Sequence, residues 1–257
     1  MNTIILNSGL IILALVTFVW IISLIKKDAG IMDSYWGIGF ILVTISLFLQ
    51  SPEVGHGQFI MAVLITMWGL RLSAHIAYRN LGKEEDPRYK NWRNQNGKAW
   101  WWRSYIKVFL TQGAVMWVVS APIYAVFNNT SSNNLPLSIA GLFLFTIGFF
   151  FETIADWQLL KFKKDPANKG KVFDKGLWAL SRHPNYFGEA VLWWGLGLLA
   201  LSVGAWWALI SPLFMNFLLV RVSGVKMLDE LLVKTNPEYA SYINQTSAFL
   251  PLGRKTA

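Results

Sequence analysis

The sequence contains no cysteine and only three histidines. The first absence excludes disulfides, thiolate metal sites and a cysteine nucleophile. The second argues against a histidine-rich metal centre, and we expect no bound metal. No Walker-type phosphate loop, no Ser–His–Asp order and no zinc-ligand spacing occurs along the chain. Candidate chemistry must therefore be sought among other residue types.

Charge is also scarce: only 14% of the 257 residues are charged, whereas an ordinary soluble domain has about 25%. Hydrophobic residues make up 54% of the chain, and its 14 Trp and 17 Phe suit lipid and its interfaces. This composition predicts an all-α, polytopic membrane protein rather than a soluble domain. In that setting the net charge of +9 does not indicate a nucleic-acid partner, and we expect none.

Long apolar stretches predict a single membrane domain, residues 1–257, with seven transmembrane helices. The first stretch carries no charge and is too long for the apolar region of a signal peptide, so we expect it to be retained. The second is short for a span. The predicted spans are residues 3–25, 33–49, 59–79, 105–127, 137–160, 185–201 and 206–222.

The basic residues predict how these spans are oriented. Nearly all Lys and Arg residues lie near the connections after spans one, three and five, or in the tail. The connections after spans two, four and six, residues 51–57, 128–136 and 202–204, contain none. Because basic connections stay in the cytoplasm, we expect the N-terminus outside and the C-terminus in the cytoplasm.

Polar side chains recur within the spans at intervals of four residues, which places them on one helix face. Charged groups in membrane helices are costly and usually face the bundle interior, so each is a functional-site hypothesis. With the predicted orientation, all lie toward the cytoplasmic side and predict one polar region there. The sets are Arg71, His75 and Arg79; Glu152 and Asp156; and Asn185 and Glu189, with Arg221 ending the last span and Asp33 preceding the second.

Each of these residues also has a structural interpretation. Arg79 and Arg221 could extend to the membrane interface, with their charges in water. His75 could be a packed and satisfied histidine, and Asp33 could cap a helix. The functional hypothesis depends on the convergence of the sets rather than on any one member.

The segment 176–189 is the densest polar cluster, and a purely apolar stretch follows it. Pro184 suits the first turn of a helix, where its missing N–H costs nothing. The segment is either a site for an anionic or hydrogen-bonding ligand or the polar start of an interfacial helix. Asn185 and Glu189 share one helix face, and this favours a site. Its polar members are Arg182, His183, Asn185, Tyr186 and Glu189.

With residues 181–189, the sequence resembles the steroid 5-alpha-reductase superfamily, most closely its bacterial branch of largely uncharacterised membrane proteins. Residues 33–37, 68–72, 85–89, 152–156 and 222–225 extend the resemblance over nearly the whole chain. The motif around His183 is shared in part with sterol reductases and with isoprenylcysteine and phospholipid methyltransferases, which use S-adenosylmethionine. Glu189 and Asp156 are more similar to the reductases.

The resemblance implies a multi-pass protein of the bacterial inner membrane that binds NADPH from the cytoplasm. It would reduce a carbon–carbon double bond conjugated to a carbonyl in an apolar lipid, with a 3-oxo-4-ene steroid as one candidate. The substrate would enter from the bilayer, and no protein partner is implied. A methyltransferase that uses S-adenosylmethionine is the alternative, and a non-catalytic lipid-binding protein is a third class.

The resemblance also implies roles for particular residues. Steroid-reducing members hold the ketone with a Gln–Glu pair and a Tyr that this sequence lacks, so Asp33 and His75 are the catalytic candidates. That departure leaves the substrate and the acid open. The predicted cofactor-binding residues are Arg71, Arg79, Glu152, Asp156, Lys163, Lys171, Arg182, His183, Asn185, Tyr186, Glu189 and Arg221.

Overall fold

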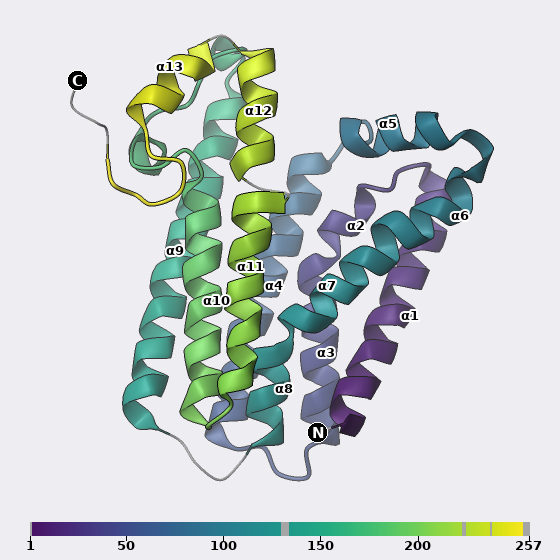
Figure 1. The fold of residues 1–257 in the computed structure, drawn as a ribbon, viewed down its shortest axis with the longest axis vertical. Coiled ribbons are helices and arrows are strands. Elements are labelled where there is room, and N and C mark those ends of the chain that lie inside the picture. Colours follow the sequence, from purple (N-terminus) through teal and green to yellow (C-terminus); the bar gives the residue numbers. More distant parts are fainter. Residues whose placement is uncertain (1, 130–133, 223–224, 237, 254–257) are drawn as a thin grey trace. The chain divides into compact units, whose positions relative to one another are not determined.

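The computed structural model describes residues 2–129, 134–222, 225–236 and 238–253. These residues form helices and connecting loops without a β-strand, which confirms the all-α prediction (Figure 1). The chain separates into two compact units, which we describe one at a time. Unit 1 is Met1–Asn133 with Val203–Ala208, and unit 2 is Asn134–Ser202 with Leu209–Ala257. Whether the chain is one folding domain stays a prediction.

Unit 1 is a set of membrane-length and shorter helices in which α3 packs against both α1 and α4. The contact between α3 and α4 is close because a Cβ added at Gly37 would lie 2.0 Å from the carbonyl oxygen of Gly69. Its helices are α1 (Asn2–Lys26), α2 (Ile31–Ser34), α3 (Trp36–Gln50), α4 (His56–Asn80), α5 (Pro87–Asn96), η1 (Gly97–Ala99), α6 (Trp100–Ser104), the π-helix η2 (Tyr105–Leu110), α7 (Thr111–Val119) and α8 (Ala121–Asn128).

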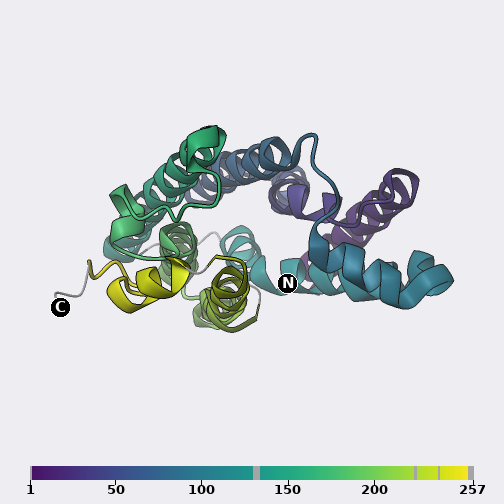
Figure 2. The same ribbon diagram turned by 90° about the horizontal axis from the view of Figure 1, so that it is seen from above.

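In unit 2, α10 packs against both α9 and α11, and α12 and α13 lie at the end where α9 stops and α10 begins (Figures 1 and 2). Figure 2 shows α13 beside the loop that joins α9 to α10. The elements are α9 (Leu135–Lys164), η3 (Pro166–Asn168), η4 (Gly176–Ala179), α10 (Pro184–Ser202), α11 (Ile210–Phe217), the π-helix η6 (Leu218–Val222), α12 (Val225–Thr235) and α13 (Glu238–Gln245). The short helix η5 (Trp206–Leu209) belongs to unit 1 as far as Ala208.

Glycines bring α9 and α10 into backbone contact. A Cβ added at Gly188 would lie 2.4 Å from the backbone nitrogen of Glu152, and one at Gly195 would lie 2.5 Å from that of Phe145. Small residues permit this approach, which gives neighbouring membrane helices their van der Waals contact. The consequence for function is that the polar turns of α9 and α10 face each other at short distance.

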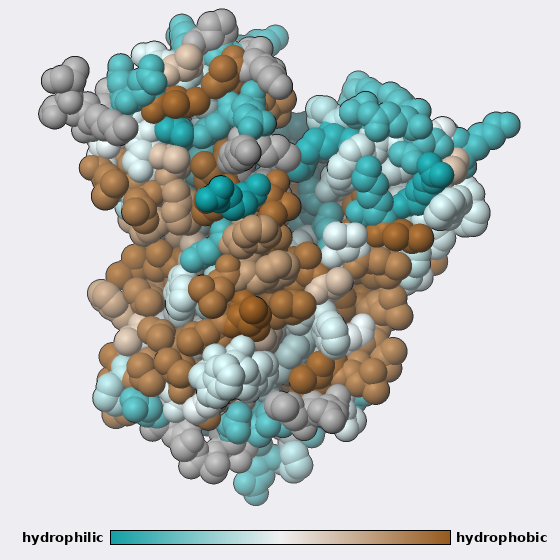
Figure 3. Space-filling view, viewed as in Figure 1, coloured by the Kyte–Doolittle hydropathy of each residue, from teal (hydrophilic) through white to brown (hydrophobic). Residues whose placement is uncertain are grey.

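The outer surfaces of the helices are apolar. Leu10, Phe18 and Ile25 on α1 and Phe143 and Phe150 on α9 expose more than half of their surface. In Figure 3, hydrophobic residues cover much of the middle of the helices, and hydrophilic residues gather over α5 and around α12 and α13. Apolar exposure of this kind suits contact with lipid tails rather than water.

Within the described residues, three helices are long and apolar enough to cross a membrane by themselves: Thr3–Lys26, His56–Asn80 and Leu135–Lys164. The bent pair Pro87–Val119 and Ala121–Asn128 would supply a fourth. The other predicted spans correspond to α10 and to the shorter apolar helices Trp36–Gln50 and Trp206–Val222. The chain therefore has the character of a membrane protein, whereas the count of seven and the orientation stay predictions.

Several predicted boundaries were wrong. The stretch 105–127 is broken, because it begins as a π-helix and bends by 42° at Ser120. Pro122, in the first turn of α8, has no N–H for an α-helical bond, so the helix restarts there. The stretch 33–49 also begins later, at Trp36, since Asp33 belongs to the separate short helix α2. The start of α10 at Pro184 confirms the predicted first-turn proline.

Candidate functional site

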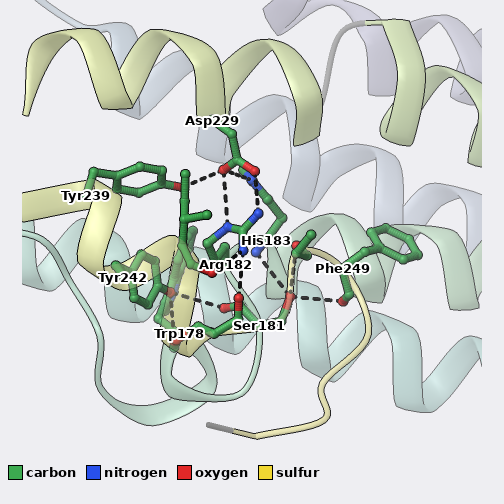
Figure 4. Close-up of polar contacts among 11 residues, drawn as sticks. Trp178, Ser181, Arg182, His183, Asp229, Tyr239, Tyr242 and Phe249 are labelled. Carbon is green, nitrogen blue, oxygen red and sulfur yellow. Dashed lines mark hydrogen bonds and ion pairs between the residues drawn. The ribbon is translucent and has the colours of Figure 1, made fainter. Parts of the chain in front are cut away.

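An ionic cluster lies at the start of α10 in unit 2. The guanidinium of Arg182 donates through Nη2 to Oδ2 of Asp229 at 2.6 Å, and its Nε lies 3.4 Å from Oδ1. Its Nη1 donates to the carbonyl oxygens of Ile243 and Thr246, at 3.2 and 2.6 Å. Arg182 is only 8% exposed, so these bonds inside the chain engage most of its donors (Figure 4).

The carboxylate of Asp229 is the centre of this cluster. Its Oδ1 lies 3.1 Å from Nε2 of His183 and accepts a hydrogen bond from the hydroxyl of Tyr239 at 2.8 Å. Burial alone would raise the pKa of Asp229, but the bonds from His183, Arg182 and Tyr239 outweigh it and hold that pKa well below its ordinary value. The ring of His183 also stacks on that of Tyr186, with centroids 5.6 Å apart.

The C-terminal segment completes the enclosure of residues 176–183. The backbone N–H of Arg182 donates to the carbonyl of Ser247 at 2.8 Å, and the Ser181 hydroxyl donates to that of Phe249 at 2.9 Å. The Tyr242 hydroxyl donates to the carbonyl of Trp178 (Figure 4). Arg182 and His183 therefore join α10 to α12, α13 and the tail, while their predicted cofactor contact stays a prediction.

A second cluster lies on the facing sides of α9 and α10. Glu152 and Asp156 on α9 are 3% and 8% exposed. The side-chain amide of Asn185 donates to Oδ1 of Asp156 at 3.1 Å. Oδ1 of Asn185 is buried and has no hydrogen-bond partner among the described residues. Buried polar atoms are almost always paired, so this acceptor points to a missing donor.

The remaining predicted residues of unit 2 surround these clusters. Glu189 lies one turn after Asn185 and is half-buried, as is Tyr186. Arg221 is exposed in η6. The segment that follows the buried acids is rich in exposed lysines, which include the predicted Lys163 and Lys171. They are Lys161, Lys163, Lys164, Lys169, Lys171 and Lys175.

Unit 1 contains a separate polar network around Asp33. Oδ1 of Asp33 accepts a hydrogen bond from the Tyr89 hydroxyl at 3.1 Å, and Nε2 of Gln112 lies 3.4 Å away. Sequence reasoning missed Tyr89 and Gln112. The available signals were the amide of Gln112 within an apolar stretch and the position of Tyr89 at the end of the similar segment 85–89.

The predicted set on α4 also belongs to unit 1. Arg71 and His75 are half-buried, whereas Arg79 is exposed and donates through Nε to Oδ1 of Asn80 at 3.3 Å. The structure thus brings Asn185 to Asp156 and brings both Arg182 and His183 to Asp229. The convergence of the α4 residues with the residues of unit 2 stays a prediction.

Within the part of the chain that the structure describes, no group of three or more His, Asp or Glu side chains could hold a metal ion.

The profile of one known protein family matches most of the chain. The profile of a protein family of unknown function, DUF1295, matches residues 19–246. The chain belongs to this family. DUF1295 is part of a group of membrane proteins that resemble steroid 5-alpha-reductases and methyltransferases. The resemblance inferred from residues 181–189 is confirmed at the level of that group.

One curated relative of this DUF1295 protein is a fungal protein of Ustilaginoidea virens named "Probable O-methyltransferase ustE". The two are 38% identical over 69 residues, which is 27% of this chain and 24% of the relative. The match thus spans about a quarter of the relative's length. No solved structure matches the chain.

Proposed function

We propose that this DUF1295 protein is a membrane enzyme that uses NADPH to reduce a carbon–carbon double bond conjugated to a carbonyl in an apolar substrate. The observation that carries the proposal is the acceptor-rich cluster of Glu152, Asp156 and Asn185, in which Oδ1 of Asn185 is buried without a partner. The amide of a nicotinamide and the hydroxyls of its ribose are donors that such acceptors would satisfy.

The charge around this cluster supports a polyanionic cofactor. NADPH carries a pyrophosphate and a 2′-phosphate, and exposed lysines on segment 161–175 could meet them as point charges. Asn185, Asp156 and Glu189 would hold the nicotinamide ribose end. When bound, NADPH supplies the hydride, and the protein supplies position and electrostatics.

The apolar surface of the helices supports an apolar substrate. The helices expose apolar side chains along their lengths, so a lipid-like molecule can reach the protein from the bilayer. In a reduction of this kind, a hydrogen-bond donor at the carbonyl oxygen stabilises the negative charge that develops there. Asp33 and His75 of unit 1 are the candidates for that role, and a 3-oxo-4-ene steroid is a suitable first probe.

A second candidate function is methyl transfer from S-adenosylmethionine. The match to a protein named as an O-methyltransferase favours it. The ammonium and sulfonium groups of S-adenosylmethionine would also suit buried carboxylates. That cofactor has no phosphate, however, so it gives no reason for the density of exposed lysines in segment 161–175.

Thermal unfolding of the purified protein with NADPH, NADH, S-adenosylmethionine or S-adenosylhomocysteine separates these functions. A ligand at a hundred times its Kd stabilises the folded protein by about 2.7 kcal/mol. We expect NADPH to raise the melting temperature and Asn185→Leu to abolish that increase. Asn7→Leu is the control, because it removes a side-chain hydrogen bond to Gln50 in unit 1.

Each other outcome has a defined meaning. Stabilisation by S-adenosylmethionine alone would overturn the reductase proposal in favour of methyl transfer. No stabilisation by any of the four ligands would indicate a non-catalytic lipid-binding protein. Stabilisation by NADPH justifies a screen of apolar enones, read as the loss of NADPH absorbance.

A further inference from the structure

The two carboxyl oxygens of Asp33 have different surroundings. Oδ1 accepts a hydrogen bond from Tyr89 at 3.1 Å and lies 3.4 Å from the side-chain nitrogen of Gln112. Oδ2 makes no hydrogen bond to any residue that the structure describes, and it is not among the fully buried atoms without a partner. Asp33 is half-buried, so one oxygen is held by the protein and the other is accessible.

The hydrogen bonds that lead to Asp33 have a defined donor-to-acceptor direction. The indole nitrogen of Trp36 is a donor only, and it lies 2.5 Å from Oε1 of Gln112. That contact orients the amide so that its nitrogen donates to the Tyr89 oxygen, at 3.1 Å. The Tyr89 hydroxyl accepts this bond and donates its own hydrogen bond to Oδ1 of Asp33. The network therefore runs from Trp36 through Gln112 and Tyr89 and ends at Oδ1.

The helix that carries Tyr89 is itself held in place. Glu85, just before α5, accepts a hydrogen bond from the backbone N–H of Ala29 at 2.8 Å and pairs with Arg93 at 2.8 Å. The side chain of Glu85 is only 8% exposed. Asp86 caps the first turn of α5 through the N–H of Arg88. The bond from Ala29 ties the start of α5 to the connection between α1 and α2, and α2 carries Asp33.

The surroundings of Asp33 change its pKa in two opposing ways. Burial is the largest influence and raises its pKa, whereas the charge of Arg88 and the hydrogen bonds from Tyr89 and Gln112 lower it. Asp86 is the other charged group that acts on it, and it raises the pKa. The net effect is a pKa above the ordinary value of about 3.9.

We infer that Tyr89 and Gln112 are positioning residues that hold Oδ1 of Asp33 and so present Oδ2 as a hydrogen-bond donor to the carbonyl oxygen of an apolar substrate. The inference rests on the proposed function for the identity of the substrate. It extends that function because neither positioning residue belongs to the cofactor cluster, and each makes contact with Asp33 through its own hydrogen bond.

Infrared spectroscopy of the cofactor-free protein tests this positioning. The difference between wild type and Asp33→Asn identifies the carbonyl stretch of protonated Asp33, which is then followed as the pH is raised. We expect its midpoint to lie above that of an ordinary aspartate. Tyr89→Phe should move the midpoint further up, because the carboxylate loses a donor. Gln112→Met should do the same, and it provides an independent variant if Tyr89→Phe does not fold.

The matched control is Tyr105→Phe, which removes a hydroxyl 2.8 Å from Thr17 elsewhere in unit 1. It should leave the midpoint of Asp33 unchanged. The inference is overturned if Asp33 titrates as an ordinary aspartate, or if Tyr89→Phe and Gln112→Met shift its midpoint no more than Tyr105→Phe does.

A 3-oxo-4-ene steroid is the probe for the substrate side. Hydrogen bonding from Asp33 should lower the stretching frequency of the bound steroid ketone, and Asp33→Leu, which has no donor, should remove that shift. An equal shift in both proteins would overturn the donor role. NADPH stabilisation is measured on the same samples. If it is absent while the ketone shift persists, the proposed reductase function has failed and the Asp33 site has not.

Discussion

At the residue scale, each buried polar side chain is positioned by the group with which it forms a hydrogen bond or an ion pair. Arg182 and His183 stand beside Asn185 in the sequence, yet they serve a different cluster. Arg182 and His183 meet Asp229, more than 40 residues away in the chain, whereas Asn185 meets Asp156 on α9. An ion pair of this kind is costly to break, because the remaining charge stays buried.

The first prediction concerns the stability that this ion pair provides. Asp229→Asn should lower the free energy of unfolding by about 3 kcal/mol, the lower end for a buried pair, because 14% of the Asp229 side chain remains exposed. Reversible unfolding in detergent measures the change. The control is Glu84→Gln, which breaks an exposed pair with Lys90 and should cause no measurable change. Equal effects of the two variants would contradict the assignment.

The same carboxylate predicts a dependence on pH. Because the pKa of Asp229 is lowered in the folded protein, its stabilising contribution is present above the unfolded pKa of about 3.9 and is lost as the pH falls below it. The difference in melting temperature between wild type and Asp229→Asn should be constant from about pH 5 to 7 and should shrink below about pH 4. A difference that grows on acidification would show that the sign is wrong.

At the element scale, sequence patterns predicted where the helices lie better than they predicted where the helices are interrupted. Pro184 marked the start of α10 because a proline fits a first turn. The interruption at Ser120 was missed, since apolar composition continues across it while Pro122 removes a backbone donor. The π-helix of residues 105–110 has no comparable signal in the sequence. Packing of α9 on α10 depends on glycines whose partners lie on another helix.

The third prediction tests that packing. Gly188→Ala should push α10 from α9, because the new Cβ would lie 2.4 Å from the backbone nitrogen of Glu152. Overpacking of this kind costs about 1–3 kcal/mol. It should also weaken any stabilisation by NADPH, since Asp156 and Asn185 would move apart. Thermal unfolding with and without NADPH measures both effects.

Gly57→Ala is the matched control for this substitution. A Cβ at Gly57, near the start of α4, meets nothing closer than 3.9 Å, so the variant should be neutral or slightly stabilising. If Gly188→Ala is as stable as Gly57→Ala, the close approach of α9 and α10 is wrong.

At the scale of the whole molecule, the open question is how many times the chain crosses the membrane. The apolar stretches of the sequence predict seven spans, whereas helix length and composition identify three or four in the described residues. The two statements differ because α3 and α10 are shorter or more polar than an isolated span. A helix that packs against neighbours can cross a bilayer with less apolar surface of its own.

The fourth prediction uses the absence of cysteine to decide the topology. Single substitutions Ser51→Cys and Asn129→Cys should react with a membrane-impermeant maleimide in intact cells, because both lie in connections predicted to be outside. Lys171→Cys should react only after the membrane is permeabilised. Labelling of Lys171→Cys in intact cells, or protection of Asn129→Cys, would rule out the predicted orientation.

The sequence by itself determined the class of this protein. Composition and apolar runs are summed over many residues, so they identified an all-α membrane protein, and the local motif at residues 181–189 indicated its group. Only the tertiary structure decided which polar residues act together. Asp229 with Arg182, and Tyr89 and Gln112 with Asp33, are paired across long separations in the chain, because a buried donor or acceptor requires a partner in space, wherever that partner lies in the sequence.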